Sequence, residues 1–224
     1  MDKTKINRII ILFIFSTLSG CVPSLVYSPS INLPPKPLQK EKAQILGGVG
    51  YFPETQPDRV SSKMAIGGET TIRYAFSNSY AMQIEGWYDF SSNVEDGRWG
   101  LSIASIIVFN DSSNYRFGLM PIFAAALADN SVEGGGCYIP ATFWFNHIDP
   151  LNFYAAIGPV VGIRDISDEH NQWGWGIIIN AGCGILFNDN ITMNLEFACI
   201  KQVNEYRGRQ DYFFSPSINI GYIF

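Results

Sequence analysis

Few side chains in this sequence could carry out a reaction. The chain has two histidines, His147 and His170, and His170 ends an acidic stretch in which Ser167 and Asp168 are its possible partners. A Ser–His pair could attack an ester or a peptide bond, but solvated loop charges explain this cluster more simply. The acidic residues do not have the spacing of a dedicated cation site. We therefore predict no catalytic residue, no metal and no cofactor; an enzyme at the rim of the fold, acting on lipid or peptide, would require His170.

A second group of charged residues shares one face of the elements predicted below. They are Glu69, Arg73, Glu85, Asp89, Arg116 and Glu196. Charges in a narrow interior must be paired or hydrated, because an isolated buried charge is costly. We expect the acids and the two arginines to form a polar network within a plugged, structural core. The alternative is a narrow hydrophilic pore lined by the same groups.

The elements that position these groups are two-faced strands. In 190–202, Ile191 and Leu195 alternate with Thr192 and Asn194, and successive side chains of a strand point to opposite faces. Ten such segments follow one another: 43–52, 64–76, 79–90, 98–109, 114–127, 137–146, 151–164, 173–187, 190–202 and 211–224. They predict an all-β fold, an antiparallel up-and-down barrel of about ten strands, with eight as the alternative.

The connections between these segments alternate in length. Four are tight turns of Asn, Asp, Ser or Pro, at Ser77-Asn78, 110–113, 147–150 and Asn188-Asp189. The other five are longer, at 53–63, 91–97, 128–136, 165–172 and 203–210. Short periplasmic turns and longer outer loops are typical of a transmembrane barrel. An even number of strands also places both ends of the barrel on the short-turn rim.

Composition and aromatic positions indicate which face meets lipid. Charged residues are 16% of the chain, against a usual content of roughly 25%, and aromatics reach 14%. Aromatics mark both ends of the apolar face: Phe76, Tyr80, Phe109, Tyr115, Phe145, Phe153, Phe187 and Phe224 on the short-turn rim, and Tyr51, Phe90, Trp99, Trp173 and Tyr212 on the long-loop rim. Two such rows predict membrane interfaces around an apolar band. The alternative is a soluble ligand-binding barrel with the apolar face inside. The net charge of −5 argues against nucleic acid as a partner.

The start of the chain predicts export. Lys3, Lys5 and Arg8 precede the apolar run 9–15, as in a secretory signal. The sequence Leu18-Ser19-Gly20-Cys21 resembles the lipobox of bacterial lipoproteins. The resemblance implies cleavage before the cysteine and attachment of lipid to its thiol.

The next stretch, Val22 to Lys42, has five prolines and four charged residues. Such a stretch cannot pair in a sheet and tends to be extended. We interpret it as a periplasmic tether; the alternative is an ordered arm lying against or inside the barrel. The predicted domains are a signal peptide at 1–20, a lipidated cysteine and tether at 21–42, and a barrel at 43–224.

The last strand, 211–224, alternates apolar with small residues and ends on Phe224. With this strand, the aromatic rows and the lipobox, the chain resembles the small bacterial outer-membrane barrels of the outer-membrane protein A, opacity and outer-membrane X type. That family usually has glycine five residues before the terminal aromatic, where this chain has Asn219.

The resemblance implies a bacterial outer-membrane location with an N-terminal lipid anchor, and outer-membrane lipid and the assembly machinery as partners. The expected role is structural or surface-interactive, with a possible extracellular ligand at the acidic loops. The alternative role is that of a narrow, porin-like passive channel for small solutes.

Three cysteines fall within the predicted barrel. The turn at Asn188-Asp189 places Cys199 opposite about Ile179, and Cys183 then lies four residues along the strand, beyond the reach of a disulfide. We interpret Cys183 and Cys199 as small apolar residues facing lipid. Cys137 is expected to be a free thiol.

Overall fold

The computed structural model describes residues 31–55, 60–90, 98–110, 114–128, 131–148, 150–164, 172–204 and 209–224. They form β1 (Ala43–Thr55), β2 (Val60–Ser77), β3 (Tyr80–Asp89), β4 (Arg98–Val108), β5 (Tyr115–Leu119), β6 (Ile122–Ala128), β7 (Ser131–Tyr138), β8 (Ala141–Ile148), β9 (Leu151–Arg164), β10 (Gln172–Phe187), β11 (Ile191–Asn204) and β12 (Arg209–Ile223). Within these ranges, no helix has the length and apolar character needed to cross a membrane.

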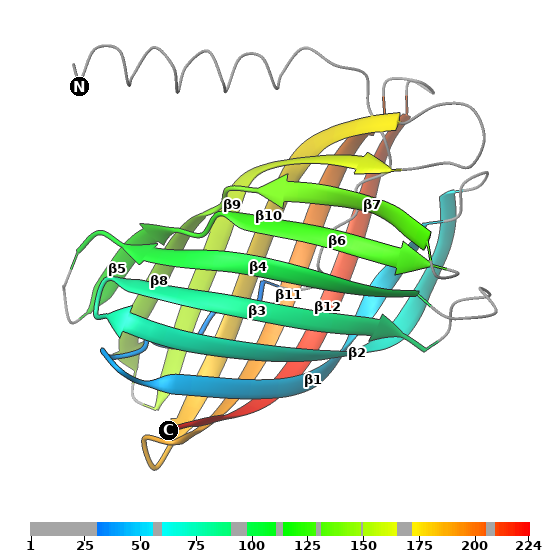
Figure 1. Cartoon of the computed structure of the whole chain (residues 1–224). Coiled ribbons are helices and arrows are strands. Elements are labelled where there is room, and N and C mark those ends of the chain that lie inside the picture. Colours follow the sequence, from blue (N-terminus) through cyan, green and yellow to red (C-terminus); the bar gives the residue numbers. More distant parts are fainter. Residues whose placement is uncertain are drawn as a thin grey trace, which may run out of the picture.

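The strands close into one antiparallel barrel (Figure 1). The first strand, β1, pairs with the last, β12, from Gln44 to Gly50. β5 and β6 form one wall strand interrupted at Pro121, and β7 and β8 form another interrupted at Pro140. The twelve segments therefore build ten wall strands, which confirms the prediction of ten and not the alternative of eight.

Both interruptions come from proline, which has no N–H to give to a neighbouring strand. The hydrogen bonds that remain run from the N–H of Ser105 to the carbonyl of Pro121, from Met120 to Pro140 and from Ile139 to Pro159, at 3.0, 3.0 and 3.1 Å. A hydrogen-bonded pair of antiparallel residues normally exchanges two such bonds, so each of these pairs lacks the return bond. The three prolines lie on neighbouring wall strands, within one residue of the same level.

The tight turns gather at the rim where the barrel begins and ends. Asn188 and Asp189 have φ values of 49° and 58°, the left-handed conformation that tight hairpin turns use. A two-residue turn at 78–79 joins β2 to β3. The N–H of Phe224 donates to the carbonyl of Ala43 at 2.9 Å, which ties the two ends of the barrel together. This is the short-turn rim that the sequence predicted.

At the opposite rim the strands run further than predicted. β1 continues to Thr55 and β2 starts at Val60, so strand replaces much of the expected loop 53–63. Only 129–130 separates β6 from β7, in place of 128–136. Ladder hydrogen bonds join main chains and need no apolar face. Strand pairing therefore continues beyond the residues whose alternation reveals it.

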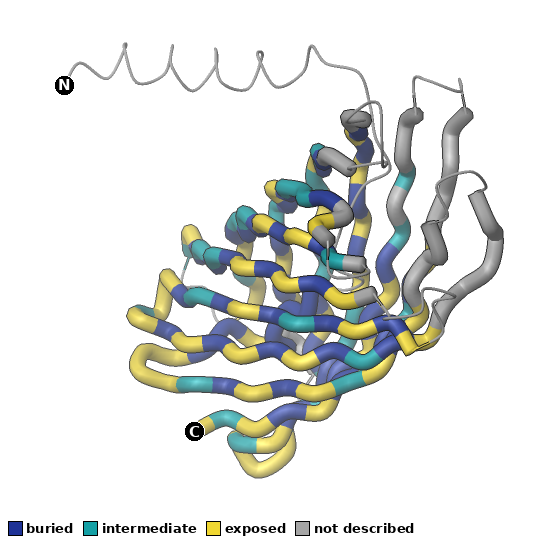
Figure 2. Tube along the Cα trace, turned by 45° about the vertical axis from the view of Figure 1, so that its right-hand side comes forward, coloured by how far each residue is buried: buried dark blue, intermediate teal, exposed yellow. Residues whose placement is uncertain are grey.

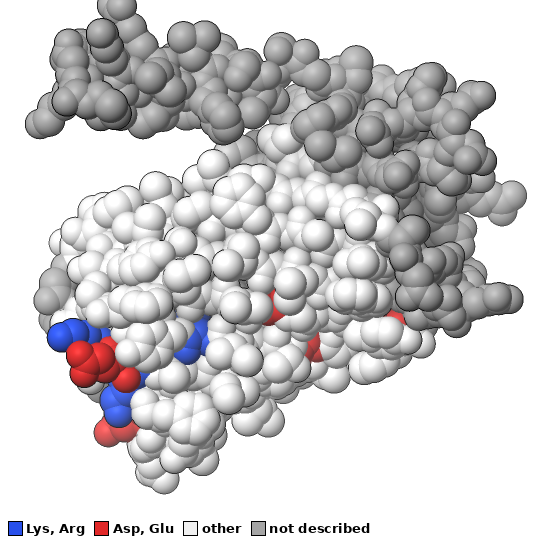
Figure 3. Space-filling view, in the orientation of Figure 1, with Lys and Arg blue, Asp and Glu red and all other residues white. Residues whose placement is uncertain are grey.

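Buried and exposed residues alternate along the strands (Figure 2). On β3 every second residue is buried. Outward residues at mid-strand are apolar, and Ile72, Ile84 and Ile103 are 54%, 49% and 42% exposed. Figure 3 shows a flank with few charged groups, which gather at the lower left near the short-turn rim. The apolar face is thus outside, and the alternative of a soluble barrel with an apolar cavity is wrong.

Aromatic side chains bound this apolar band. All eight predicted for the short-turn rim are exposed: Phe76, Tyr80, Phe109, Tyr115, Phe145, Phe153, Phe187 and Phe224. Neighbouring rings contact one another, as Phe76 and Tyr80 do with centroids 5.8 Å apart. On the other rim Tyr51, Phe90 and Trp99 are exposed. The side chains of Trp173 and Tyr212 lie outside the described part of the chain.

The cysteine register agrees with the sequence analysis. Cys199 pairs with Ile179 across β10 and β11, and Cys183 pairs with Leu195. Both cysteines are half-buried free thiols, and so is Cys137.

Candidate functional site in the barrel lumen

The inward face of the wall carries many polar side chains among apolar ones. Its buried polar residues are Gln44, Glu69, Thr71, Arg73, Gln83, Glu85, Asp89, Ser102, Thr142, Asn152, Asn180, Thr192, Asn194, Glu196, Ser215, Ser217 and Asn219. Side chains alone just fill the interior of an eight-stranded barrel, and diameter grows with strand number. Ten strands therefore enclose more space than the side chains of the wall fill.

Residues 31–38 occupy this space. All of them except Lys36 are buried, although none belongs to a strand. We call this segment the lumen arm. It leaves the barrel at the short-turn rim, where the N–H of Lys40 donates to Asn78 Oδ1 at 2.9 Å. An arm inside the barrel was the alternative to a periplasmic tether, and it is the arrangement that residues 31–38 adopt.

Four consecutive carbonyl oxygens of the lumen arm accept hydrogen bonds from side chains of the wall. Gln83 Nε2 donates to the carbonyl of Ile31 at 3.1 Å, Arg73 Nη2 to that of Asn32, Asn194 Nδ2 to that of Leu33 at 3.2 Å, and Trp144 Nε1 to that of Pro34 at 3.0 Å. The donors come from β3, β2, β11 and β8. In the described structure, the side-chain amide of Asn32 has no hydrogen-bond partner, although it is buried. The wall thus holds the arm by its main chain.

Glu196 binds the inner end of the arm. Its Oε1 accepts hydrogen bonds from the N–H of Ile31 at 2.7 Å and from Asn180 Nδ2 at 3.0 Å. The hydroxyl of Tyr154 donates to Oε2 at 3.3 Å. Because Glu196 is only 3% exposed, these donors take the place of water around the carboxyl group.

Arg73 is the cation at the centre of the site. It is 1% exposed, and its Nε and Nη2 donate to Gln83 Oε1 at 3.0 and 2.6 Å. Its Nη1 donates to Gln44 Oε1, and Gln44 Nε2 donates to Thr192 Oγ1 at 2.9 Å. Gln83 Nε2 also contacts Glu85 Oε2 at 3.4 Å. Two glutamines therefore link the arginine to the arm and to neighbouring wall strands.

The structure brings three of the six predicted network residues together around the lumen arm. Glu69, Arg73, Glu85, Asp89 and Glu196 are buried, and Arg116 on β5 is half-buried. Arg73, Glu85 and Glu196 gather around the lumen arm. Glu69 instead accepts a hydrogen bond from Asn219 Nδ2 at 2.6 Å. A functional role for these groups stays a prediction.

Sequence reasoning missed Gln44, Trp144, Tyr154 and the docking of the arm. Trp144 and Tyr154 are 0% and 2% exposed and point inward. A buried indole N–H or phenol O–H usually needs a hydrogen-bond partner. The sequence analysis assigned no wall residue as the hydrogen-bond partner of Trp144 or Tyr154. The missing partners were the available signal that another segment lies inside the barrel.

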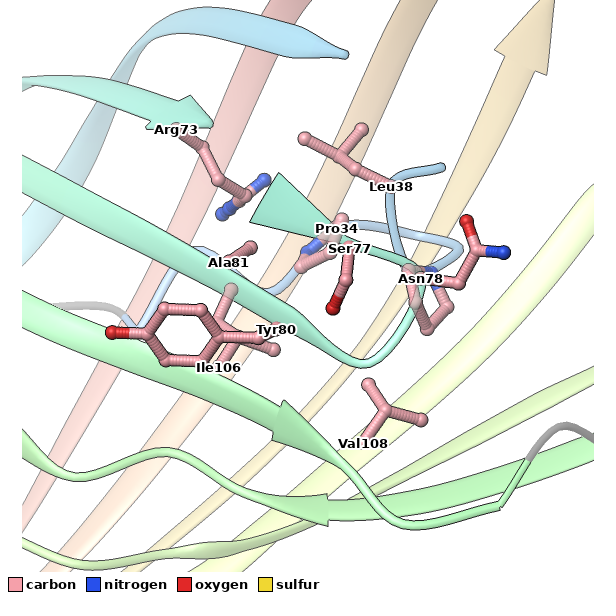
Figure 4. Close-up of a pocket in the computed structure, with 10 residues that line it drawn as sticks. Pro34, Leu38, Arg73, Ser77, Asn78, Tyr80, Ala81, Ile106 and Val108 are labelled. Carbon is pink, nitrogen blue, oxygen red and sulfur yellow. The ribbon is translucent and has the colours of Figure 1, made fainter. Parts of the chain in front are cut away.

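Little space remains beside the arm. Figure 4 shows Pro34 and Leu38 of the arm facing Ala81, Ile106 and Val108 of the wall around a cavity of about 10 Å³. A volume of this size holds about one water molecule. The arm and the wall are therefore closely packed at this point.

The residues considered for catalysis are not assembled in the described structure. His147 lies in β8, and its side chain is outside the described part, as are Ser167, Asp168 and His170 altogether. Among the described side chains, no group of three or more His, Cys, Asp or Glu could hold a metal ion. The prediction that the chain is not an enzyme stays a prediction.

No family model and no curated protein matches the sequence. Among solved structures, the chain is similar to the N-terminal β-barrel domain of OprF from Pseudomonas aeruginosa, with 13% identity, a TM-score of 0.41 and coverage of 84% of this chain and 100% of that one. It is also similar to the outer membrane protease OmpT from Escherichia coli, with 10% identity, a TM-score of 0.42 and coverage of 89% and 96%. A third similar structure is the KdgM porin in complex with disordered oligogalacturonate, with 10% identity, a TM-score of 0.45 and coverage of 81% of this chain and 98% of that one. At these identities the likeness concerns the barrel fold alone.

Proposed function

We propose that this chain is a bacterial outer-membrane barrel, additionally anchored through a lipid on Cys21, with a structural or surface-interactive role. The exposed apolar band between two aromatic rows supports insertion of the strands into a bilayer. The short-turn rim would face the periplasm, because the chain enters β1 there and the lipid-bearing residue precedes β1 by 22 residues.

The lumen arm is the observation that favours a structural role over transport. Residues 31–38 fill the short-turn half of the interior and are bound at four consecutive carbonyls. A passage for solutes would have to cross this filled region. We therefore expect the native barrel to be electrically silent in a planar lipid bilayer.

Membrane insertion is tested with a Cys21→Ser variant exported by a cleavable signal peptide. Retention in the outer membrane, with faster gel migration before boiling than after, is the expected result. It would mean that the strands span the bilayer and the lipid is only an additional tether. Release of the folded variant into the periplasm would refute the proposal.

A narrow channel is the second candidate, because the wall of the lumen carries buried Glu69, Glu85, Asp89 and Glu196. A channel lined by these groups would conduct ions, and Glu85→Ala or Arg116→Ala would alter its conductance. An electrically silent native protein would exclude this function. Steady conductance by the native protein would instead reject the structural role.

A surface-interactive role would belong to the long-loop rim. On the proposed orientation this rim faces outward, and the acidic residues 165–170 fall there in the sequence. Binding of an extracellular ligand would be lost when these residues are replaced by Gly and Ser. Unchanged binding to cells or to purified barrel would exclude the acidic loop as the contact.

A further inference from the structure

The lumen arm meets the wall as a ligand meets a binding site. Its five hydrogen bonds to side chains run to Gln83, Arg73, Asn194, Trp144 and Glu196. These residues belong to β2, β3, β8 and β11, which lie on different sides of the barrel. The wall thus surrounds the segment and binds it from several sides.

The chemistry of the wall fits a segment poor in N–H groups. Pro34, Pro35 and Pro37 have no N–H, so only their carbonyls need partners. The wall groups that bind the carbonyls are all donors: a guanidinium, two amides and an indole. The one acceptor, Glu196, meets an N–H of the arm, that of Ile31. Main-chain donors and acceptors of the arm are therefore matched by wall groups at the N–H of Ile31 and at the carbonyls of Ile31 to Pro34.

The shape of the wall fits the same segment. A Cβ on Gly184 would overlap the ring of Pro35, so the missing side chain makes room for the proline. Ile31 and Leu33 are 0% exposed, and Leu38 is 7% exposed. These three residues belong to the hydrophobic cluster that fills the lumen. The site thus combines apolar contacts with recognition of the main chain.

The barrel closes without any contribution from the arm. Ten wall strands form a complete ring of pairings, with β1 joined to β12, and residues 31–38 contribute no strand to it. The side chain of Asn32 makes no hydrogen bond within the described structure, although its carbonyl is bound. The arm is therefore bound inside a barrel whose strand pairings are complete without it.

We propose that the short-turn half of the lumen is a binding site for an extended, proline-containing peptide, and that residues 31–38 occupy it as an exchangeable ligand in cis. The same segment supplied as a separate peptide will then bind when the covalent arm is free to leave. This inference depends on the closed wall and its lumen and not on the proposed location of the protein.

The test uses the full chain with a protease site inserted between Gln39 and Lys40, which are exposed at the short-turn rim. The protein is folded first and then cleaved, so that the arm stays in the lumen without a covalent link. A fluorescent peptide of residues 31–38 is added, and its binding is followed by anisotropy. The indole N–H resonance of Trp144 reports on the site, because this group donates to the carbonyl of Pro34.

The expected result is saturable exchange of the labelled peptide for the cleaved arm, with the native Trp144 resonance restored. Two outcomes would overturn the proposal. A cleaved arm that stays in place and admits no labelled peptide would be a fixed part of the core. A barrel that loses its fast gel migration on cleavage would need the arm for its fold.

Variants distinguish main-chain recognition from simple hydrophobic trapping. Gln83→Ala and Asn194→Ala each remove a donor to an arm carbonyl and should weaken peptide binding roughly two- to tenfold. A peptide with Asn32→Ala should bind as the native peptide does, because that side chain has no partner in the described structure. A peptide with Leu33→Asp should not bind. Equal binding by both barrel variants and the parent would refute recognition of the main chain.

Discussion

Replacement of Gly184 by alanine should affect the lumen arm and the barrel in opposite directions. A Cβ at this position overlaps the ring of Pro35 and stands 2.7 Å from Asn194 Oδ1, well inside normal contact distance. Overpacking of this kind costs about 1–3 kcal/mol. Glycine within a strand is roughly 0.5–1 kcal/mol less favourable than alanine, so the wall itself gains from the change. The arm should loosen while the barrel keeps or increases its stability.

Hydrogen exchange at the indole N–H of Trp144 measures the loosening, because this N–H donates to Pro34, next to Pro35. A cost of about 1–3 kcal/mol raises the population of the open arm, and hence the exchange rate, about 5- to 150-fold. The temperature at which the fast-migrating form disappears from a gel measures the barrel. Gly47→Ala is the matched control, since a Cβ there has no neighbour within 4 Å.

Two results would refute this reasoning. An unchanged Trp144 exchange rate in Gly184→Ala would mean that Pro35 does not limit the space at Gly184. Equal acceleration in Gly47→Ala would mean that the effect comes from the wall strand and not from the arm.

Three further substitutions test other parts of the structure. Ile84→Arg, at the middle of the apolar band, should lower the stability of the membrane-inserted barrel by about 2–4 kcal/mol, whereas Tyr80→Arg at the rim should lower it by about 0–1 kcal/mol. Equal losses of stability in a lipid-refolding titration would contradict a bilayer around this band. Glu196→Ala leaves the Ile31 N–H and the Asn180 amide without their acceptor, at about 1–3 kcal/mol for each group, and Glu196→Gln should recover most of that loss in thermal unfolding. If Gln is as damaging as Ala, hydrogen bonding does not explain the role of Glu196. Gly100→Ala places a Cβ 2.6 Å from Trp87 Nε1 and should lower the stability of the barrel by about 1–3 kcal/mol. The fluorescence spectrum of Trp87 should change as well. An unchanged unfolding midpoint and an unchanged spectrum would show that the wall relaxes freely at Gly100.

The wall of the barrel could be predicted because lipid and lumen impose opposite demands on alternate residues. The period of two in 190–202 gave β11, and the turn at Asn188-Asp189 gave the pairing of Cys199 with Ile179. The same reasoning stopped short at the long-loop rim. The pairing of Thr55 with Val60 extends the strands past the predicted segments, because main-chain hydrogen bonds need no alternation in the sequence.

The docking of the lumen arm could not be predicted in the same way. A proline-rich segment has the same composition whether it is extended in water or bound by side chains in a barrel. Its partners Arg73 and Glu196 were predicted to lie on the inner face, but a position on the inner face does not reveal what a residue binds. Only the surplus volume of a ten-stranded barrel, together with inward Trp144, indicated that something further had to fill the lumen.

The proline row makes the barrel mechanically uneven. Pro121, Pro140 and Pro159 lie on neighbouring wall strands within one residue of the same level, and each leaves its strand pair with one hydrogen bond where two are normal. Because the missing bonds lie at one level, they form a crease across neighbouring strands and not three scattered defects. Lateral force should therefore bend the wall most easily along this crease.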